Sequence, residues 1–510
     1  MRQRHPLRRL IYGRSVIVIL GLMLQFVLLF WFMVTLAERV PALLGGTAVL
    51  TAVMLCYVLN TRSNPSIKLS WCFIIAVLPV FGVVLYLYIQ LDIGHRLEQK
   101  QLQKTLADSE KYIRDDPALL DQLRQEDGDF YNLAAYLRRS GFSVHANTDV
   151  TYFPVGEDKF AQMCIELEKA QKFIFLEYFF IGISGMWDQI LEILRRKVQE
   201  GVEVRVMYDG TSTIAYLPHD YPQQLEKMGI RCKVFSPIRP LASTHYNNRD
   251  HRKILVVDGR TAFTGGVNLL DRYINRKPVF GHWKDTAVMV QGEAARSFTL
   301  MFLQMWNALE REPVYDQYLA PQSSAPFAQG CVIPYADSPL DRENVGEMVY
   351  LDMLNHARRY IYIMTPYLIL DQEMLTAILF AAKRGVDVRI VLPGIPDKKY
   401  AYELAKNHYP ELLEAGVRLY QYTPGFVHAK TFLSDDRQAV VGTINLDYRS
   451  LYLHFECAAY LYRVPALRDI KADFEDTMAK SRLVTQEDVK KRTLRSRLAG
   501  AVLKIAAPLM

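Results

Sequence analysis

The stretch that decides the fold is His251-Arg-Lys-Ile-Leu-Val-Val-Asp258, which runs on to Gly265-Gly-Val-Asn268. A second stretch, from His428-Ala-Lys430 to Gly442-Thr-Ile-Asn445, repeats it 177 residues later. In both copies Lys follows His by two residues, Asp by seven, the first Gly by fourteen and Asn by seventeen. One His-x-Lys pair arises easily by chance, whereas two extended copies with matched spacing indicate a duplicated catalytic half-site.

Each copy also belongs to a larger repeat of secondary structure. Both halves contain a β-branched and aromatic run typical of a buried strand, then a segment with helical periodicity, then a second strand. These segments are 172–181, 187–200 and 202–208 in the first half and 359–365, 372–384 and 386–392 in the second. A strand–helix–strand unit is expected to be parallel and right-handed. The sequence therefore predicts an α/β protein with a mixed β-sheet flanked by helices in each half.

The domain boundaries follow from this repeat. We expect a first domain over 131–312 and a second over 328–484, joined by a linker at 313–327 that contains Pro and Ser residues typical of a boundary. A charge-rich helical connector covers 93–130, and a basic amphipathic tail covers 485–510. A pseudo-twofold axis between the two domains would bring both His-x-Lys motifs to one cleft.

The first 92 residues differ in composition from the rest of the chain. Three runs without a charged residue, 16–37, 40–59 and 69–90, approach or exceed the roughly 18–20 apolar residues that cross a bilayer as a helix. The first run is longer than the apolar part of a signal peptide and is followed by two more. We therefore expect an N-terminal transmembrane segment at 1–92 and a multi-pass protein of the cell membrane.

The orientation of this segment in the membrane stays open. Basic residues before the first run place the N-terminus in the cytoplasm by the positive-inside rule, whereas those after the third run favour the opposite arrangement. The two groups are Arg2, Arg4, Arg8, Arg9 and Arg14, and His95, Arg96, Lys100 and Lys104.

Charge and cysteine content narrow the class of protein further. The net charge of +7 is modest and its excess lies near the ends of the chain, which suits contact with anionic lipid headgroups. The six cysteines are isolated, without a Cys-x-x-Cys pair or a His/Cys cluster at zinc spacing, so no disulfide framework is expected. The tail at 485–510 is typical of an interfacial helix, with a terminal packing helix as the alternative.

The residue types in the two motifs suit phosphodiester chemistry. His251 and Lys253 stand two apart at the start of a strand, so their side chains point to the same face. Asn268 can add an amide donor beside them. With Lys430 and Asn445 of the second half, these groups would hold the non-bridging oxygens as charge develops. We expect one His to attack phosphorus, and the other to protonate the leaving alkoxide and deprotonate the acceptor.

No metal or cofactor is expected in this chemistry. Two histidines with ordinary pKa values of about 6.5 can act near neutrality, and nothing in the sequence resembles a carboxylate cage for Mg²⁺. Asp258 and Asp435, which complete the two catalytic motifs, are expected at the far end of their strands. There they would support a turn more than touch phosphate.

Other carboxylates are candidates for orienting the histidines. Asp285 and Glu456 can each bind the second ring nitrogen of a catalytic His and fix its tautomer, with a surface or capping role as the alternative. Glu177 stands inside an apolar strand, where an unpaired carboxylate is costly, so it either lines the cleft or forms a buried structural pair. His282 and His454 are interpreted as packing or rim residues.

The paired motifs resemble the signature of the phospholipase D superfamily, H-x-K-x(4)-D-x(6)-G-[GST]-x-N in two copies. Within it, the chain is most similar to the bacterial cardiolipin synthases, over residues 130–480 approximately. The residues that carry this resemblance are Phe175-Leu-Glu-Tyr178, Tyr208-Asp-Gly210, Asp250-His-Arg-Lys253, Gly265-Gly-Val-Asn268, His282-Trp-Lys-Asp285, Thr365-Pro-Tyr367 and Asn445-Leu-Asp-Tyr-Arg-Ser450. One departure is the number of spans, because members of that family typically have two and three are predicted here.

The resemblance implies an activity and a substrate. A phosphatidyl group would pass from one phosphatidylglycerol to another, giving cardiolipin and glycerol, at the bacterial cell membrane and without a cofactor. It also implies that His251 is the nucleophile and His428 the general acid and base, although the pseudo-symmetry of the halves allows the reverse order.

Other functions remain open from the motifs. Water could replace the lipid acceptor, as in a hydrolytic phospholipase D, and a phosphatidylserine synthase would use serine with a nucleotide-linked lipid. A nuclease of the superfamily is disfavoured because no basic-aromatic stripe for nucleic acid is evident. A catalytically inactive membrane scaffold is disfavoured by the two intact motifs. The sequence does not define acyl preference or oligomeric state.

Overall fold

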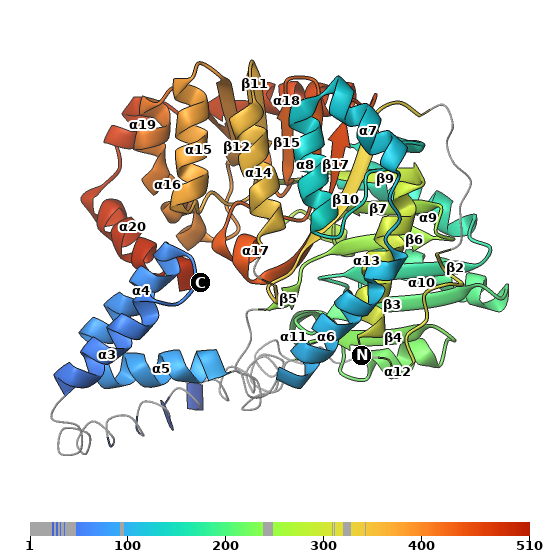
Figure 1. The fold of residues 1–510 in the computed structure, drawn as a ribbon, viewed down its shortest axis with the longest axis horizontal. Helices are drawn as coiled ribbons and strands as arrows, with labels where there is room; N and C mark the ends of the chain where they lie inside the picture. Colours follow the sequence, from blue (N-terminus) through green and yellow to red (C-terminus); the bar gives the residue numbers. More distant parts are fainter. Residues whose placement is uncertain are drawn as a thin grey trace, which may run out of the picture.

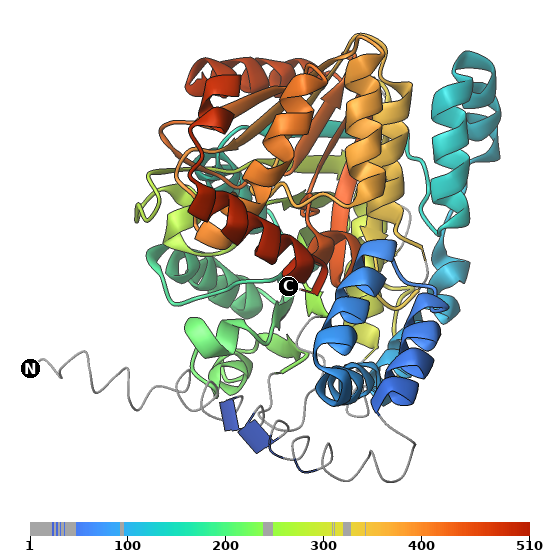
Figure 2. The ribbon, with the colours of Figure 1, turned by 90° about the vertical axis from the view of Figure 1, so that its left-hand side faces the viewer.

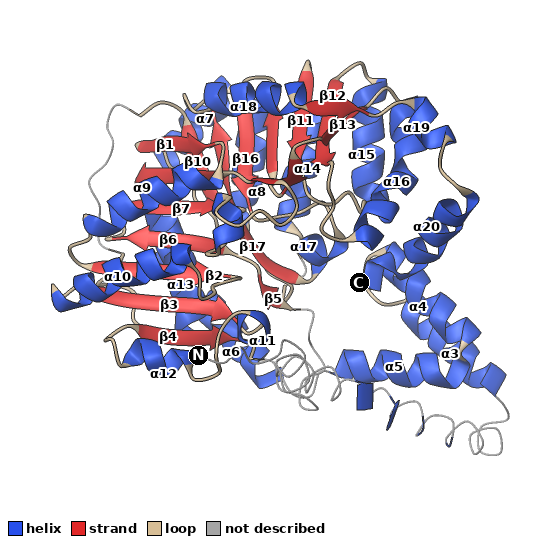
Figure 3. Cartoon of the chain, turned by 180° about the vertical axis from the view of Figure 1, so that it is seen from behind, coloured by secondary structure: helices blue, strands red, loops and turns tan. Residues whose placement is uncertain are grey.

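A computed structural model provides the structure of the protein. It describes residues 23–24, 27–28, 31, 35, 47–91, 96–237, 248–308, 310, 312–319, 328–341 and 343–509. Two α/β domains form the body of the molecule, each built on one mixed sheet with helices on its faces (Figure 1). Seen from behind in Figure 3, the strands of the first sheet run across the view and those of the second run up it.

The first domain is built on a seven-stranded sheet of order β1-β9-β7-β6-β2-β3-β4. Its strands are β1 (Thr148–Phe153), β2 (Phe173–Tyr178), β3 (Glu203–Asp209), β4 (Arg231–Phe235), β6 (Lys253–Val257), β7 (Thr261–Gly265) and β9 (Ala287–Gly292). The main helices are α9 (Gly156–Glu168), α10 (Gly185–Gln199), α12 (Tyr221–Glu226) and α13 (Ala294–Asn307). Strand β2 pairs parallel with β3 and antiparallel with β6, so the sheet is mixed as the sequence predicts.

The second domain repeats this plan on a sheet of order β10-β17-β16-β15-β11-β12-β13-β18. Its strands are β10 (Cys331–Asp337), β11 (Tyr360–Met364), β12 (Asp387–Pro393), β13 (Arg418–Tyr422), β15 (Thr431–Ser434), β16 (Gln438–Gly442), β17 (His454–Tyr462) and β18 (Ser481–Leu483). Its helices include α14 (Val345–His356), α15 (Gln372–Lys383), α16 (Lys399–Glu414), α17 (Tyr448–Tyr452) and α18 (Leu467–Ala479). Strands β11 and β12 are parallel and β11 and β15 antiparallel, as in the first domain.

The two domains share a core rather than only touching at their surfaces. Helix α13 of the first domain packs on β9 and on β10 of the second, and 11 of its 14 residues are buried. A helix that is apolar almost all round needs cover on every side. Its side chains therefore join one hydrophobic cluster with residues of both sheets.

Two short strand pairs cross between the domains. Strand β5 (Arg249–Asp250) extends the second domain's β17 in parallel, with Arg249 opposite His454. Strand β14 (Gly425–Val427) pairs in parallel with the first domain's β8 (His282–Lys284). Each pair lies directly beside one His-x-Lys motif, so these crossings fix the two motifs relative to each other.

The connector packs on both domains, with its first helix against α13 of the first domain and its last helix against the second domain. Its helices are α6 (Arg96–Ser109), α7 (Pro117–Glu126) and α8 (Gly128–Arg139), in agreement with the predicted helical character. Phe130 of α8 stacks on Tyr462 with ring centroids 3.7 Å apart, and Leu133 and Leu137 join the second domain's core. Helix α8, which contains residue 131, is amphipathic, and its apolar face is covered by the second domain. The start of the first domain at residue 131 stays a prediction.

The N-terminal apolar region is divided into short helices. They are α3 (Thr47–Leu59), α4 (Pro65–Val77) and α5 (Pro79–Leu91), each of 13 residues, and they pack together beside the second domain (Figure 2). The predicted helix over 69–90 is thus two helices. Leu78 leaves the helical conformation, at φ −129° and ψ 74°, because the following Pro79 disfavours it there.

Within the part of the chain that the structure describes, no helix is long and apolar enough to cross a membrane. The predicted run at 16–37 lies largely outside the described residues, and the run at 40–59 is described only from Thr47 onward.

Candidate active site

The two catalytic histidines are each anchored to the opposite domain through the backbone. The N–H of His251 donates to the carbonyl of Phe455 at 2.9 Å, and the N–H of His428 donates to the carbonyl of Lys284 at 2.7 Å. Both hydrogen bonds continue the short strand pairs that cross between the domains. The sequence prediction that one site is built from both halves agrees with this arrangement.

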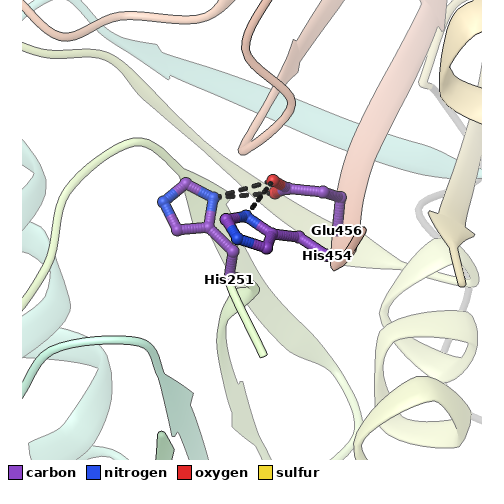
Figure 4. A group of neighbouring side chains, drawn as sticks. All are labelled: His251, His454 and Glu456. Atoms are coloured by element: carbon purple, nitrogen blue, oxygen red, sulfur yellow. Dashed lines mark hydrogen bonds and ion pairs between the residues drawn. The ribbon is translucent and has the colours of Figure 1, made fainter. Parts of the chain in front are cut away.

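The carboxylates that orient the histidines are also exchanged between domains. Both oxygens of Glu456 lie 2.9 Å from His251 Nδ1 (Figure 4), and Asp285 Oδ2 lies 2.6 Å from His428 Nδ1. All four side chains are buried. A carboxylate at Nδ1 holds a proton on that nitrogen and leaves the Nε2 lone pair available. Each half-site is therefore incomplete without the other domain.

Charge and burial keep both imidazoles neutral. Burial, together with Lys253 and other neighbouring cations, lowers the pKa of His251 well below 6.5. Burial and Lys430 lower the pKa of His428 to about 3 against the opposing pull of Asp285. Neutral imidazole is the form that can attack phosphorus or accept a proton.

The two orienting carboxylates differ in their environment. Burial alone would raise the pKa of Asp285, but His428 and Lys430 outweigh it and lower that pKa. Burial dominates at Glu456 and raises its pKa well above the ordinary value, although Lys253 opposes this. The half-sites are therefore pseudo-symmetric in geometry but not in electrostatics.

The two lysines are held by their own motifs. Lys253 Nζ donates to the carbonyl of His251 at 2.5 Å, and Lys430 Nζ donates to the carbonyl of His428. Burial lowers the pKa of Lys253 to about 8 and that of Lys430 to about 7. Two buried ammonium groups beside two histidines form a binding site for a phosphate anion.

The two asparagines are not equivalent. Asn268 Oδ1 accepts from the N–H of Phe180 at 3.0 Å, and its amide donates to the Tyr273 hydroxyl at 2.9 Å. Asn445 is also buried, but among the described residues its Oδ1 has no hydrogen-bond partner. Asn268 therefore also holds the segment after β2 in place.

Asp258 and Asp435 lie at the far ends of their strands from the histidines. Asp258, with φ +54°, accepts from the N–H groups of residues 171, 172 and 173 at 2.7–2.9 Å. Asp435, with φ +57°, accepts from those of 358, 359 and 360 at 2.7–2.8 Å. Each aspartate thus fixes the start of the adjacent strand, β2 or β11.

Glu177 forms a buried ion pair. Its Oε1 lies 2.5 Å from Arg252 Nη2, and Arg252 also bonds Asp250 at 3.3 Å. Arg252 stands between His251 and Lys253, so its side chain points to the opposite face of the strand. Of the two predicted roles for Glu177, the geometry corresponds to the buried structural pair rather than a cleft-lining one.

Two further residues shape the site, and they occupy equivalent positions in the repeat. A Cβ on Gly266 would lie 1.9 Å from Asp285 Oδ1, so only glycine lets that carboxylate reach His428. Its counterpart 177 residues later, Thr443, donates from Oγ1 to Glu456. Both positions belong to the sequence motif. Spacing alone does not show that Gly266 leaves space for Asp285 whereas Thr443 donates a hydrogen bond to Glu456.

The structure also gathers a group that sequence reasoning missed. His251, His454 and Glu456 offer three potential metal-ligand atoms within 4.8 Å of one another (Figure 4). The sequence favours a packing or rim role for His454. Its proximity to His251 could not be read from spacing because the two come from different domains.

Comparison with known proteins agrees with this geometry. The family model described as "Cardiolipin synthase, PLD-like domain" matches residues 163–306 and 350–478, and the model "Phospholipase D-nuclease N-terminal" matches 49–90. A cardiolipin synthase of Halalkalibacterium halodurans is 33% identical over 481 residues, covering 92% of this chain and 94% of that protein. An uncharacterized protein of Streptococcus mutans serotype c is 54% identical over 455 residues, covering 89% and 99%.

A solved structure shows the same fold. The phosphatidylserine synthase of Haemophilus influenzae Rd KW20 superposes with a TM-score of 0.54 at 16% identity, over 71% of this chain and 95% of that one. The family model, which matches more than half of the chain, and the cardiolipin synthase that is 33% identical establish its family. The chain belongs to the cardiolipin synthases of the phospholipase D superfamily.

Proposed function

We propose that the protein is a cardiolipin synthase, a phosphatidyltransferase that uses one phosphatidylglycerol as donor and a second as acceptor. The observation that carries this proposal is the exchange of carboxylates: Glu456 on His251 and Asp285 on His428. It produces two oriented imidazoles beside two buried lysines in a chain whose curated relatives include several cardiolipin synthases.

In the first step, His251 Nε2 attacks the phosphorus of the donor. A nitrogen–phosphorus bond forms, the bond from phosphorus to the glycerol oxygen breaks, and protonated His428 supplies a proton to that oxygen. The anionic phosphate and Asp285 favour imidazolium at His428 once substrate is bound. Lys253, Lys430 and the amide of Asn445 hold the non-bridging oxygens as negative charge develops.

In the second step, neutral His428 takes a proton from a hydroxyl of the second phosphatidylglycerol. The resulting oxygen attacks the phosphohistidine, the nitrogen–phosphorus bond breaks, and cardiolipin leaves. Protons balance over the cycle, because the one given to glycerol is recovered from the acceptor. The products are cardiolipin and glycerol in equal amounts.

Hydrolysis and serine transfer use the same first half of this chemistry. The discriminating experiment gives purified enzyme phosphatidylglycerol alone and analyses lipids by mass spectrometry. Cardiolipin with an equal amount of glycerol supports the proposal. Phosphatidic acid as the main product would assign a hydrolase, and activity that requires serine and a nucleotide-linked lipid would assign a phosphatidylserine synthase.

We also propose that the enzyme acts at the bacterial cell membrane, held by its N-terminal segment and by α20 (Leu494–Ala506). Leu494, Leu498 and Val502 are 73%, 60% and 68% exposed, and their four-residue spacing puts them on one helix face. Next to α20, Ser70 of α4 donates to the Ile505 carbonyl at 2.6 Å, so α4 and α20 lie side by side (Figure 1). Their exposed apolar side chains suit insertion into a bilayer surface.

Flotation with phosphatidylglycerol vesicles tests the α20 part of this attachment. Replacing Leu494, Leu498 and Val502 together by Ser should reduce the membrane-bound fraction without changing the melting temperature. Unchanged flotation would restrict attachment to the N-terminal segment.

A further inference from the structure

The pseudo-symmetry of the site is broken at one pair of equivalent residues. Trp283 stands two residues before Asp285, and His454 stands two residues before Glu456. The Trp283 ring lies 5.2 Å from the His428 ring at an interplanar angle of 45°. The His454 ring lies 5.4 Å from the His251 ring at 41°. An indole in one half-site is therefore replaced by an imidazole in the other, in nearly the same position.

Imidazole in place of indole changes which hydrogen bonds and ligands the side chain can take at this position. Trp283 has one ring nitrogen, which donates to Asp285 at 3.4 Å. His454 is 9% exposed, and among the described residues neither of its ring nitrogens has a hydrogen-bond partner. Its Nδ1 lies 3.6 Å from Glu456 Oε1, beyond hydrogen-bond length. A buried imidazole with unsatisfied nitrogens is costly unless a ligand or ion completes it.

We propose that His251, His454 and Glu456 form a binding site for a divalent transition-metal ion of the Zn²⁺ class, and that the ion inhibits the enzyme. The three side chains point toward one another (Figure 4), and their ligand atoms lie within 4.8 Å of one another. Bonds of about 2.0–2.2 Å in a tetrahedral site place ligand atoms roughly 3.3 Å apart. The separations of 2.9 Å from His251 Nδ1 to Glu456 and 3.6 Å from His454 Nδ1 to Glu456 bracket this value.

The donor set selects the type of ion. Two imidazoles and one carboxylate suit Zn²⁺, Co²⁺, Ni²⁺ or Cu²⁺, whereas Mg²⁺ and Ca²⁺ prefer oxygen ligands. The ammonium of Lys253, bonded to the His251 carbonyl at 2.5 Å, repels a dication. We therefore expect affinity on the order of micromolar, well below that of closed structural zinc sites.

Occupation of this site stops phosphatidyl transfer. The ion takes over Glu456 and a nitrogen of His251, so the imidazole loses both its orientation and its availability for attack on phosphorus. The other half-site cannot bind a second ion in the same way, because Trp283 offers no lone pair. The site therefore takes one ion per chain.

Metal binding is tested first. This measurement requires no catalytic turnover, so its outcome does not depend on the proposed function. Purified full-length protein, freed of metal with EDTA and exchanged into chelator-free buffer, is titrated with Co²⁺ and then Zn²⁺. Visible absorption and calorimetry follow the titrations. One equivalent should bind with the visible bands of low-coordinate Co²⁺, and Zn²⁺ should displace it. No band and no saturable heat up to millimolar metal would overturn the proposal.

Variants locate the ion and tie it to inhibition. His454→Trp copies the other half-site, His454→Asn keeps a small polar side chain, and His356→Asn on α14 removes a histidine elsewhere as the matched control. Loss of an outer-shell partner alone costs about 10–100-fold in metal affinity, so both His454 variants should bind Zn²⁺ at least about 100-fold more weakly. The Zn²⁺ concentration that halves cardiolipin formation should rise by the same factor. Unchanged affinity in both folded His454 variants would place the ion elsewhere.

Discussion

Asp285 of the first domain lies 2.6 Å from Nδ1 of His428 in the second domain. The reverse relationship joins Glu456 to His251. A histidine and the carboxylate that fixes its tautomer thus come from different halves of the duplicated chain. Neither domain alone contains a complete catalytic histidine–carboxylate pair, which gives a physical reason for the duplication.

Asp285→Asn should lower the turnover number by at least about 100-fold while leaving the fold intact. The amide keeps the shape of the side chain but cannot stabilise an imidazolium at His428, and it can hold the wrong tautomer. Initial rates of cardiolipin formation and a thermal melt measure the two effects. A rate within a few-fold of the native enzyme would show that the 2.6 Å contact has no role in proton transfer.

Gly266→Ala should disable the enzyme through Asp285. The new methyl group would lie 1.9 Å from Asp285 Oδ1, so the carboxylate must move away from His428. Gly128→Ala is the matched control, because nothing lies within 4 Å of its Cβ position. We expect a rate loss comparable to that of Asp285→Asn for Gly266→Ala and none for the control. Equal activity of the two variants would contradict the steric argument.

Asp258→Ala and Asp435→Ala should destabilise the protein more than they impair chemistry. Each aspartate accepts three backbone N–H groups at the start of a strand. Loss of such an acceptor costs about 1–3 kcal/mol. Urea unfolding measures this change, and assays well below the unfolding transition should retain most of the native rate. A large rate loss without a change in stability would move these residues into the catalytic machinery.

Anion binding should weaken as pH rises through the lysine pKa values. Burial lowers these to about 8 for Lys253 and about 7 for Lys430, so each ammonium is present below its pKa and lost above it. Sulfate keeps its charge over this range and is a suitable probe. Its inhibition constant should be steady near pH 6 and should increase from pH 7 to 9. A constant value up to pH 9 would contradict the lowered lysine pKa values.

The sequence predicts much of this architecture because the information is local. The strands at 173–178 and 360–364 are continuous apolar runs, and the matched spacing of the two motifs places histidine and lysine together. The aspartates at the strand ends follow from the same spacing. These features depend on periodicity and on residue type alone.

The remaining features depend on contacts between distant segments. Nothing in the spacing shows that Asp285 serves His428 rather than His251, or that α8 crosses to the second domain. The helix break at Leu78 does have a local signal, because Pro79 follows it. The continuous apolar composition of 69–90 nevertheless predicts one unbroken helix. His454 lies beside His251 only because β5 adds to the second domain's sheet.

The central claim is that His251 carries the phosphatidyl group and His428 delivers the acceptor. The most direct measurement mixes the enzyme with phosphatidylglycerol, quenches the mixture under alkaline conditions within one turnover and maps modified peptides by mass spectrometry. The account predicts a phosphatidyl adduct on His251 that disappears as cardiolipin forms. No adduct on His251, or an adduct on another residue, would contradict it.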